Sequence, residues 1–318
     1  MGGDLQRLLV GGIIAALCLA SPALAEYRAP RTAHSVPDFD GTWTNNSLTE
    51  LERPDEFKAL IVSDAEAAAF EKIWRGKPPK IKDDVGGADS EWWDTDVGLA
   101  RIRGGARTSW IVAPADGQIP FTAAAKAANK ALGDRRKVDF ENPESRDLGE
   151  RCLATGSAGP PLRNGGQSDN FKIVQTPDRI AILTEYGGNV RIVRLGDARH
   201  PPTSVRLRMG DSIGRWEGET LVVETTNFSP TEVRAAQGDT HADMRVVERF
   251  SRTSPTEFLY AFEVRNPARF AQAWQGEMIF RKLAAPIFEY ACHEGNYSLP
   301  GILSGARQQE AAAAKAKP

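Results

Sequence analysis

The chain lacks an excess of charge of either sign. Its 318 residues include 40 Lys and Arg against 42 Asp and Glu, which gives a formal net charge of −2. Binding to the phosphates of a nucleic acid depends on a surplus of basic side chains, so this balance argues against nucleic acid as a partner. Hydrophobic residues make up 41% of the chain, which is enough for a sizeable core.

Long apolar runs are also scarce. The run at 8–20 is too short to span a bilayer comfortably, and it follows Arg7 and precedes Ala23-Leu24-Ala25. A basic start, a short apolar run and an A-x-A site are typical of a secretory signal peptide. We therefore predict cleavage after Ala25 (signal 1–25), a periplasmic location and no integral membrane segment in the mature protein.

Cysteine is rare, and one of the three cysteines, Cys18, lies inside the predicted signal. The mature chain keeps Cys152 and Cys292. In an oxidising compartment such a pair favours one disulfide, although two buried free thiols would also fit the sequence. Two cysteines without a spaced pair of histidines make a poor metal site, so no metal is predicted.

Most motifs of cofactor and metal enzymes are missing. The sequence has no βαβ rhythm with a glycine-rich phosphate loop, and no H-E-x-x-H, EF-hand or Walker pattern. Residues 210–214 read G-x-S-x-G, but the nucleophile elbow needs a strand–turn–helix context, and here a hairpin strand follows. Ser212 is therefore a weak candidate nucleophile, and no cofactor is predicted.

The sequence does contain many short strands joined by turn residues. The central stretch, 209–228, predicts strands at 212–216 and 220–226 around an acidic turn in which Gly218 adopts a positive φ. In 258–264 apolar residues alternate with others, as in a strand with one buried face. Further strands are predicted at 171–175, 180–186, 190–195, 244–252, 257–264, 276–282 and 287–292.

Nine short strands without intervening helices indicate an antiparallel barrel or sandwich. We predict a mainly β fold, an antiparallel lipocalin-like β-barrel at 151–305, whose interior holds either packed side chains or one small ligand. Residues 26–150 read as a helix-and-loop region around the barrel, with a strand at 108–112. Its helices are predicted at 64–74, after a Ser63–Glu66 capping box, and at 123–132, after Thr122. The Ala- and Lys-rich tail, 306–318, is predicted to be disordered.

Several motifs occur in a fixed order along the chain. They are RTSWIV (107–112) with DG (116–117), RCL (151–153), IVQTP (173–177), MGDSIGRWEGETLVVETTNF (209–228), RVVERF (245–250) and EYACHEGNY (289–297). Together they resemble a large family of exported, mostly uncharacterised bacterial proteins. The resemblance covers about 110–307 and implies a bacterial, periplasmic protein, without implying a reaction. Many members carry His where this chain has Gly188, so a chemical role of that His would be lost or changed here.

Histidines are the natural acid–base candidates because they titrate near neutral pH. His241 precedes a predicted strand, and His293 follows Cys292, so both are candidate catalytic residues at a barrel rim. His200 lies in a loop and is a candidate substrate-binding residue. His34 belongs to the lead-in and is expected to be exposed. An ordinary loop or packing role remains open for each of them.

Glu185 is a third candidate catalytic residue, and Arg191 lies across the Gly187-Gly188 turn from it. If both face the lumen, the pair could orient a polar substrate group, but a cross-strand salt bridge is as plausible. Tyr186 and the pair Trp92-Trp93 are candidate substrate-binding residues, the two tryptophans either covering an apolar pocket or docking on the barrel wall. Asp211 and Ser212 could each act as a base, but the interpretation as turn caps is favoured. Glu217 and Glu219 are interpreted as solvated, and Glu248 and Glu294 carry less weight.

The sequence thus predicts a periplasmic enzyme that works without a cofactor on a small hydrophobic or aromatic molecule. Acid–base chemistry, as in a lyase, an isomerase or a hydrolase, is the expected reaction class. A periplasmic carrier that uses the same cavity is the first alternative, and an envelope structural or assembly protein is the second. The sequence gives no oligomeric state.

Overall fold

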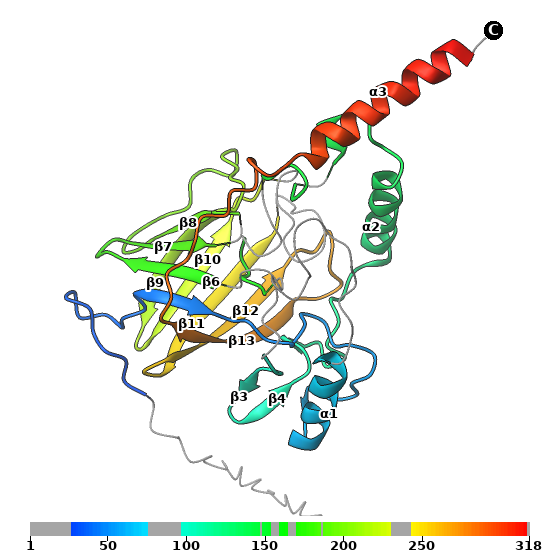
Figure 1. The fold of residues 1–318 in the computed structure, drawn as a ribbon. Helices are drawn as coiled ribbons and strands as arrows, with labels where there is room; N and C mark the ends of the chain where they lie inside the picture. The colour runs from blue at the N-terminus through cyan, green and yellow to red at the C-terminus, as the bar shows by residue number, and fades with distance from the viewer. Residues whose placement is uncertain are drawn as a thin grey trace, which may run out of the picture.

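A closed β-barrel forms the centre of the computed structural model, which describes residues 27–75, 97–146, 148–153, 159–164, 170–185, 187–229 and 243–316 (Figure 1). Nine strands follow each other around the barrel in the order β1-β6-β7-β8-β9-β10-β11-β12-β13, and β13 closes the ring on β1. A tenth strand, β5, pairs with the start of β13. The predicted mainly β, antiparallel barrel is confirmed.

The strand bounds agree closely with the alternation in the sequence. The lipocalin-like detail stays a prediction, because lipocalin barrels have eight strands and this one has nine. The strands are β1 (Gly41–Thr44), β5 (Ile111–Ala113), β6 (Asn170–Gln175), β7 (Arg179–Thr184), β8 (Val190–Arg194), β9 (Asp211–Glu217), β10 (Thr220–Thr226), β11 (Arg245–Ser254), β12 (Glu257–Arg265) and β13 (Trp274–Leu283).

One contact in the ring is parallel, between β8 and β9. A closed ring with an odd number of strands cannot alternate direction at every contact, so at least one neighbouring pair must be parallel. Among the described pairings this pair is β8–β9, and it is joined through only Val193↔Ser212 and Arg194↔Ile213. Parallel neighbours need a long connection. The loop 195–210 supplies it, and this loop carries His200.

The barrel interior is filled with side chains, and most of the largest ones are aromatic. Phe258 stacks on Phe280 with ring centroids 4.7 Å apart, and Trp43 meets Phe258 edge-on at 4.8 Å. Phe39, from the segment before β1, packs against Phe250 and Phe258. The sequence left open whether the interior holds packed side chains or one small ligand. The described residues form a packed interior.

The packing is tight where Gly276 of β13 faces Phe262 of β12. A Cβ added at Gly276 would lie 2.3 Å from the ring of Phe262. We expect Gly276→Ala to lower the free energy of unfolding by about 1–3 kcal/mol, as overpacked cores do. Urea denaturation measures it. Gly133→Ala is the control, because nothing lies within 4 Å of that position in a helix, where alanine is favoured. An unchanged midpoint for Gly276→Ala would show that the ring moves aside at no cost.

The N-terminal region packs on the outside of the barrel, as predicted, but it also contributes strands to it. β1 and β5 both come from residues before 151, so the predicted domain boundary at 151 is wrong. The strand predicted at 108–112 overlaps β5, whereas β1 was not predicted because four residues show little alternation. Besides these, a small sheet of β2 (Ile61–Val62), β3 (Arg101–Ile102) and β4 (Gly105–Arg107) lies beside the barrel (Figure 1).

Both predicted N-terminal helices are present, as α1 (Asp64–Arg75) and α2 (Ala123–Arg136), and a 3-10 turn follows at Pro143–Ser145. The capping box forms, because the backbone N–H of Ser63 donates to Glu66 at 2.9 Å and that of Glu66 donates to the Ser63 hydroxyl at 3.3 Å. The Thr122 hydroxyl accepts from the N–H of Ala125 at 3.1 Å and caps α2. Local capping chemistry therefore placed both helix starts correctly.

Two predictions for the C-terminal part are wrong. Residues 287–292 form no strand, because the closed ring of β1 to β13 leaves no barrel edge for them to join. The tail is not disordered through 316 but forms the helix α3 (Ser298–Ala316), which projects away from the barrel (Figure 1). Alanine, glutamine and lysine are strong helix formers, which accounts for the helix. Within the described residues, no helix has the length and apolar character needed to cross a membrane.

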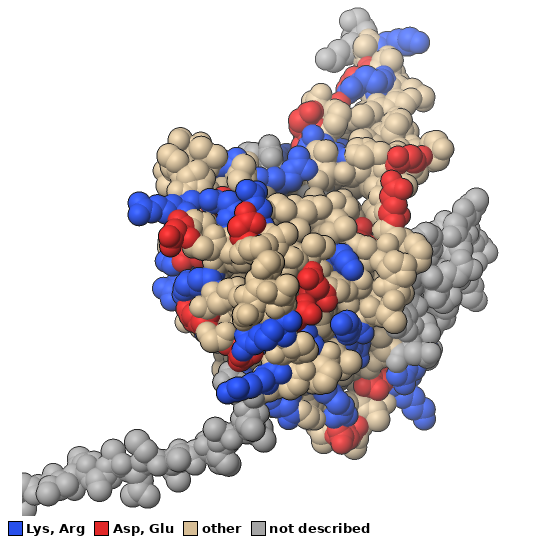
Figure 2. Space-filling view, turned by 90° about the vertical axis from the view of Figure 1, so that its left-hand side faces the viewer, with Lys and Arg blue, Asp and Glu red and all other residues tan. Residues whose placement is uncertain are grey.

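The predicted disulfide between Cys152 and Cys292 is present. It joins the segment before β6 to the segment after β13. On the face shown in Figure 2, basic and acidic side chains lie close together rather than in separate areas of one sign. This agrees with the nearly balanced charge of the sequence.

Candidate functional site

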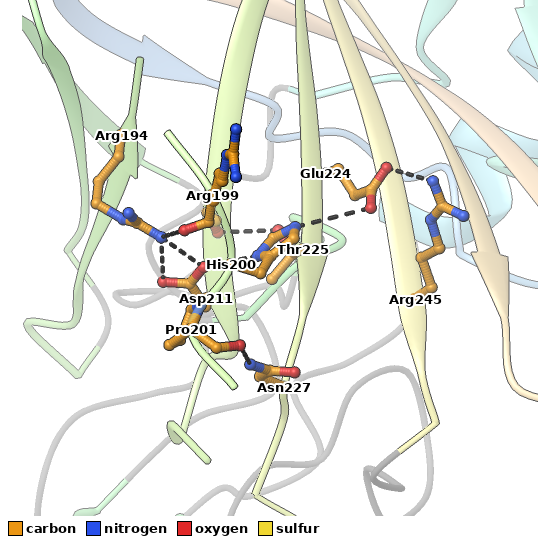
Figure 3. Close-up of polar contacts among 10 residues, drawn as sticks. Arg194, Arg199, His200, Pro201, Asp211, Glu224, Thr225, Asn227 and Arg245 are labelled. Atoms are coloured by element: carbon orange, nitrogen blue, oxygen red, sulfur yellow. Dashed lines mark hydrogen bonds and ion pairs between the residues drawn. The ribbon is translucent and has the colours of Figure 1, made fainter. Parts of the chain in front are cut away.

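The strongest cluster of acid–base groups lies on the outer wall of the barrel, where the loop 195–210 crosses β9 and β10 (Figure 3). His200 comes from the loop, and its Nδ1 atom lies 2.6 Å from Oδ2 of Asp211 at the start of β9. An ionised carboxylate only accepts hydrogen bonds, so Nδ1 carries the proton and donates it. In its neutral form, this histidine therefore has its free electron pair on Nε2.

Arg194, the last residue of β8, fixes the carboxylate of Asp211. Its Nη2 atom donates to the two oxygens of Asp211 at 2.9 and 2.7 Å and to the backbone carbonyl of Arg199 at 2.9 Å. The side chain of Asp211 is 9% exposed, so these hydrogen bonds are largely shielded from water. Arg194 thus holds both the loop and the group that orients the imidazole.

Glu224 of β10 lies on the other side of the imidazole. Its Oε1 atom is 3.7 Å from Nε2 of His200, and its second oxygen pairs with Arg245 of β11 (Figure 3). Nε2 is buried and has no hydrogen-bond partner in the described structure. A buried polar atom without a partner is rare and costly, which marks this nitrogen as a functional candidate.

A side chain that follows β10 also holds the loop in place. Asn227, just after β10, donates from its side chain to the carbonyl of Pro201 at 3.0 Å. Asn227 has a φ of +57°, a conformation that asparagine tolerates better than most residues. This side chain anchors the loop directly beside His200.

Ser212 does not belong to the cluster, although it is the next residue after Asp211. Neighbouring strand residues point to opposite faces, so Ser212 faces the interior. Its hydroxyl pairs there with that of Thr225 at 2.8 Å. The G-x-S-x-G letters therefore form a hairpin strand and no nucleophile elbow, as the sequence indicated. Asp211, by contrast, is a partner of His200 rather than a turn cap.

A second polar cluster is buried inside the barrel. Glu248 of β11 accepts two hydrogen bonds from Arg191 of β8, at 2.6 and 3.0 Å, and a third from the Tyr260 hydroxyl at 2.7 Å. The same hydroxyl accepts from the N–H of Leu162 at 2.8 Å. The side chains of Arg191 and Glu248 are 3% and 0% exposed, so this pair is enclosed.

Burial sets the ionisation of this interior cluster. Burial and the neighbouring Glu248 carboxylate raise the pKa of Tyr260 well above its usual value, so the phenol stays protonated and donates. Burial by itself lowers the pKa of Arg191, but Glu248 outweighs it and holds that pKa above its usual value. The cluster is therefore a salt bridge with a bound phenol, enclosed by packed side chains.

The predicted pair of Glu185 and Arg191 does not form. Arg191 faces the interior opposite Ile182, whereas Glu185 lies just beyond β7 and accepts from the side chain of Asn170 at 2.6 Å and the N–H of Phe288 at 2.7 Å. The alternation of β7 buries Ile182 and Thr184. Glu185 therefore belongs to the opposite face from Arg191.

His293 lies in a separate pocket of about 200 Å³ beside the disulfide. Gly187, Glu289 and Glu294 line this pocket too, and His293 is exposed. Glu185 lies close to the same segment through Phe288 but is not joined to His293 by any described contact. His34 is exposed, as predicted, and His241, Tyr186, Trp92 and Trp93 lie outside the described residues.

Two groups that are central in the structure are only weakly marked in the sequence. Glu248 is a minor candidate there, and nothing in the sequence indicates Glu224. The alternation in 245–250 offered a signal for Glu248, since it lies between Val246 and Phe250 on the buried face. No group of three or more His, Cys, Asp or Glu side chains able to hold a metal occurs within the described part of the chain.

Comparison with known proteins adds no family to this picture. No family model matches the chain, and no curated protein matches its sequence.

Proposed function

We propose that this protein is an exported enzyme that uses His200 to transfer protons on a small hydrophobic or aromatic molecule, without a cofactor. The observation that carries the proposal is a histidine that lies between two carboxylates, with Asp211 hydrogen-bonded to Nδ1 and Glu224 3.7 Å from Nε2. Histidine is the side chain that most often transfers protons in general acid–base catalysis. It suits a lyase, an isomerase or a hydrolase.

The three residues have different roles in this proposal. Asp211, held by Arg194, orients the imidazole and stabilises its protonated form, as the carboxylate of a catalytic triad does. Nε2 of His200 takes up or releases the proton. Glu224, whose side chain is 23% exposed, lies 3.7 Å from that nitrogen and exchanges the proton between it and the substrate.

The alternatives draw less support from the geometry. A carrier would need an open lumen, and the described interior is filled by aromatic rings and the Arg191–Glu248 pair. A structural protein is favoured by a filled barrel with exposed apolar residues, and Val174, Val190 and Ile192 are exposed on the outer wall. Neither alternative accounts for the oriented imidazole at the crossover loop.

The proposed periplasmic location draws support from the disulfide. Disulfides persist in oxidising compartments such as the periplasm, and this chain has one between Cys152 and Cys292. The predicted signal, 1–25, lies outside the described residues. N-terminal sequencing of the protein recovered from the periplasm tests the cleavage site after Ala25.

The proposal is tested by an untargeted mass-spectrometric assay with a small-molecule extract of the host culture. We expect wild-type protein to convert at least one compound, and His200→Gln to slow that conversion by at least about 10²-fold, the usual contribution of a general acid–base group. His34→Gln is the matched control, because His34 is exposed and far from the cluster in the chain. It should keep full activity.

Other outcomes separate the competing functions. A compound retained unchanged by wild type would indicate a carrier. A reaction that survives His200→Gln at full rate would reject this site and direct attention to His293 and its pocket.

A further inference from the structure

A groove of about 300 Å³ crosses the outer wall of the barrel over β11, β12 and β13, beside β5. It is separate from the filled interior. Its lining includes Val112, Val247, Arg249, Ala261, Glu263 and Glu277.

The groove exists because short side chains alternate with long ones on this wall. In one row across the strands, Ala261 lies between Arg249 and Glu277. In the next row, Val247 lies between Glu224 and Glu263. Cross-strand neighbours of this kind have Cβ atoms about 5 Å apart, so a short residue between two long ones leaves a trough. Val112 of β5 closes one side with an apolar wall.

The charges around the groove leave a surplus of arginine. Glu277 pairs with Arg107 at 2.7 Å and Arg103 at 3.5 Å, and Glu263 pairs with Arg265 at 2.6 Å. Arg249 shares Glu217 with Arg215, at 2.8 and 2.6 Å. These ion pairs contain five arginines and three glutamates, of which Arg249, Glu263 and Glu277 line the groove. Both lining carboxylates are paired with arginines, so Arg249, which shares a single carboxylate with Arg215, is the lining cation that attracts an anion.

The groove lies one strand away from the His200 cluster. Glu224, which faces His200, is the direct cross-strand neighbour of Val247 in the groove floor. Adjacent strands are about 4.8 Å apart, so a molecule lying over Val247 and Ala261 ends within about 5 Å of Glu224. The two features can therefore serve one ligand.

We infer that this groove binds an amphipathic organic anion, an aromatic or aliphatic carboxylate. Its apolar body lies on Val247 and Ala261, and its carboxylate faces Arg249, whose guanidinium matches a carboxylate in shape and charge. The inference rests on the proposed function only in naming this anion as the substrate. Binding itself requires no turnover.

The experiment is a calorimetric titration of the mature protein with trans-cinnamate as the probe. We expect saturable binding, and we expect Ala261→Trp to weaken it at least about tenfold because the indole fills the trough. Ala181→Trp is the matched control. Ala181 lies on the outer wall of β7 between Val174 and Ile192, away from the groove, and this variant should bind as wild type does.

Two further measurements test the charge and guard against misfolding. Arg249→Gln adds no bulk to the groove. It should weaken cinnamate binding about tenfold, the usual effect of losing a charged hydrogen bond. Cinnamyl alcohol, which has no charge, should bind wild type more weakly than cinnamate. Equal affinities for the acid and the alcohol would overturn the anionic class. Failure of wild type to bind cinnamate, or undiminished binding by folded Ala261→Trp, would overturn the groove.

These results are independent of catalysis. His200→Gln should bind cinnamate normally, so a failed activity assay leaves the binding result intact. Conversely, a reaction that Ala261→Trp performs at the wild-type rate would reject the groove while the role of His200 stands.

Discussion

Arg191→Met is expected to lower the free energy of unfolding by about 3–5 kcal/mol, the usual cost of removing one partner of a buried ion pair. The substitution leaves the carboxylate of Glu248 enclosed in the barrel without a cation. Only the Tyr260 hydroxyl then remains to stabilise it. Methionine fills much of the vacated volume, so the loss reports the uncompensated charge rather than a cavity.

Urea denaturation followed by tryptophan fluorescence measures this loss. Arg215→Met is the control, because Arg215 is 61% exposed and its ion pair on the outer wall is screened by water. Its midpoint should stay close to that of wild type. The double variant Arg191→Met, Glu248→Leu should recover at least half of the loss, since it removes both charges. A double variant as unstable as the single one would show that packing, and not charge, dominates here.

Replacing Cys152 and Cys292 by serine is expected to lower the free energy of unfolding by about 4–5 kcal/mol. The bond joins residues 140 positions apart in sequence, and it spans every barrel strand except β1 and β5. In the chain-entropy account, a bridge over so long a loop restricts the unfolded chain strongly. The serine hydroxyls add little cost, because neither cysteine is fully buried.

Guanidinium denaturation of oxidised wild type, reduced wild type and the double serine variant measures the effect. The reduced protein and the variant should unfold at the same midpoint, below that of the oxidised protein. If both lost less than about 1 kcal/mol, the ends of the bridge would have to stay close together in the unfolded chain.

Strand alternation allowed much of the barrel to be predicted, because each long strand buries one face. β12, with Phe258, Tyr260 and Phe262 all inward, is a clear case. The order of strands around the ring was beyond the sequence, since alternation says nothing about which strand lies beside which. The parallel contact of β8 with β9 and the closure of β13 on β1 depend on pairings far apart in the chain.

The candidate site also depends on pairings that strand alternation does not reveal. The sequence contained His200 and Asp211, eleven positions apart, but only the parallel contact brings the loop onto β9. It predicted Glu185 beside Arg191 from the turn between them, and this failed because a turn fixes proximity along the chain and not the face of the sheet. Glu224 could not be found without the fold, because nothing in its own neighbourhood marks it.

The single parallel contact also limits how such a barrel can change in size. A hairpin contributes two strands of opposite direction, so gaining or losing a whole hairpin leaves the number of parallel contacts unchanged. Gaining one strand would give a ring with an even number of strands, which must have an even number of parallel contacts. The contact of β8 with β9 would then have to become antiparallel, or a second parallel contact would have to form. Relatives that keep the parallel contact of β8 with β9 should therefore have seven, nine or eleven strands. The crossover loop with its histidine position should persist in them, while hairpins elsewhere are gained or lost.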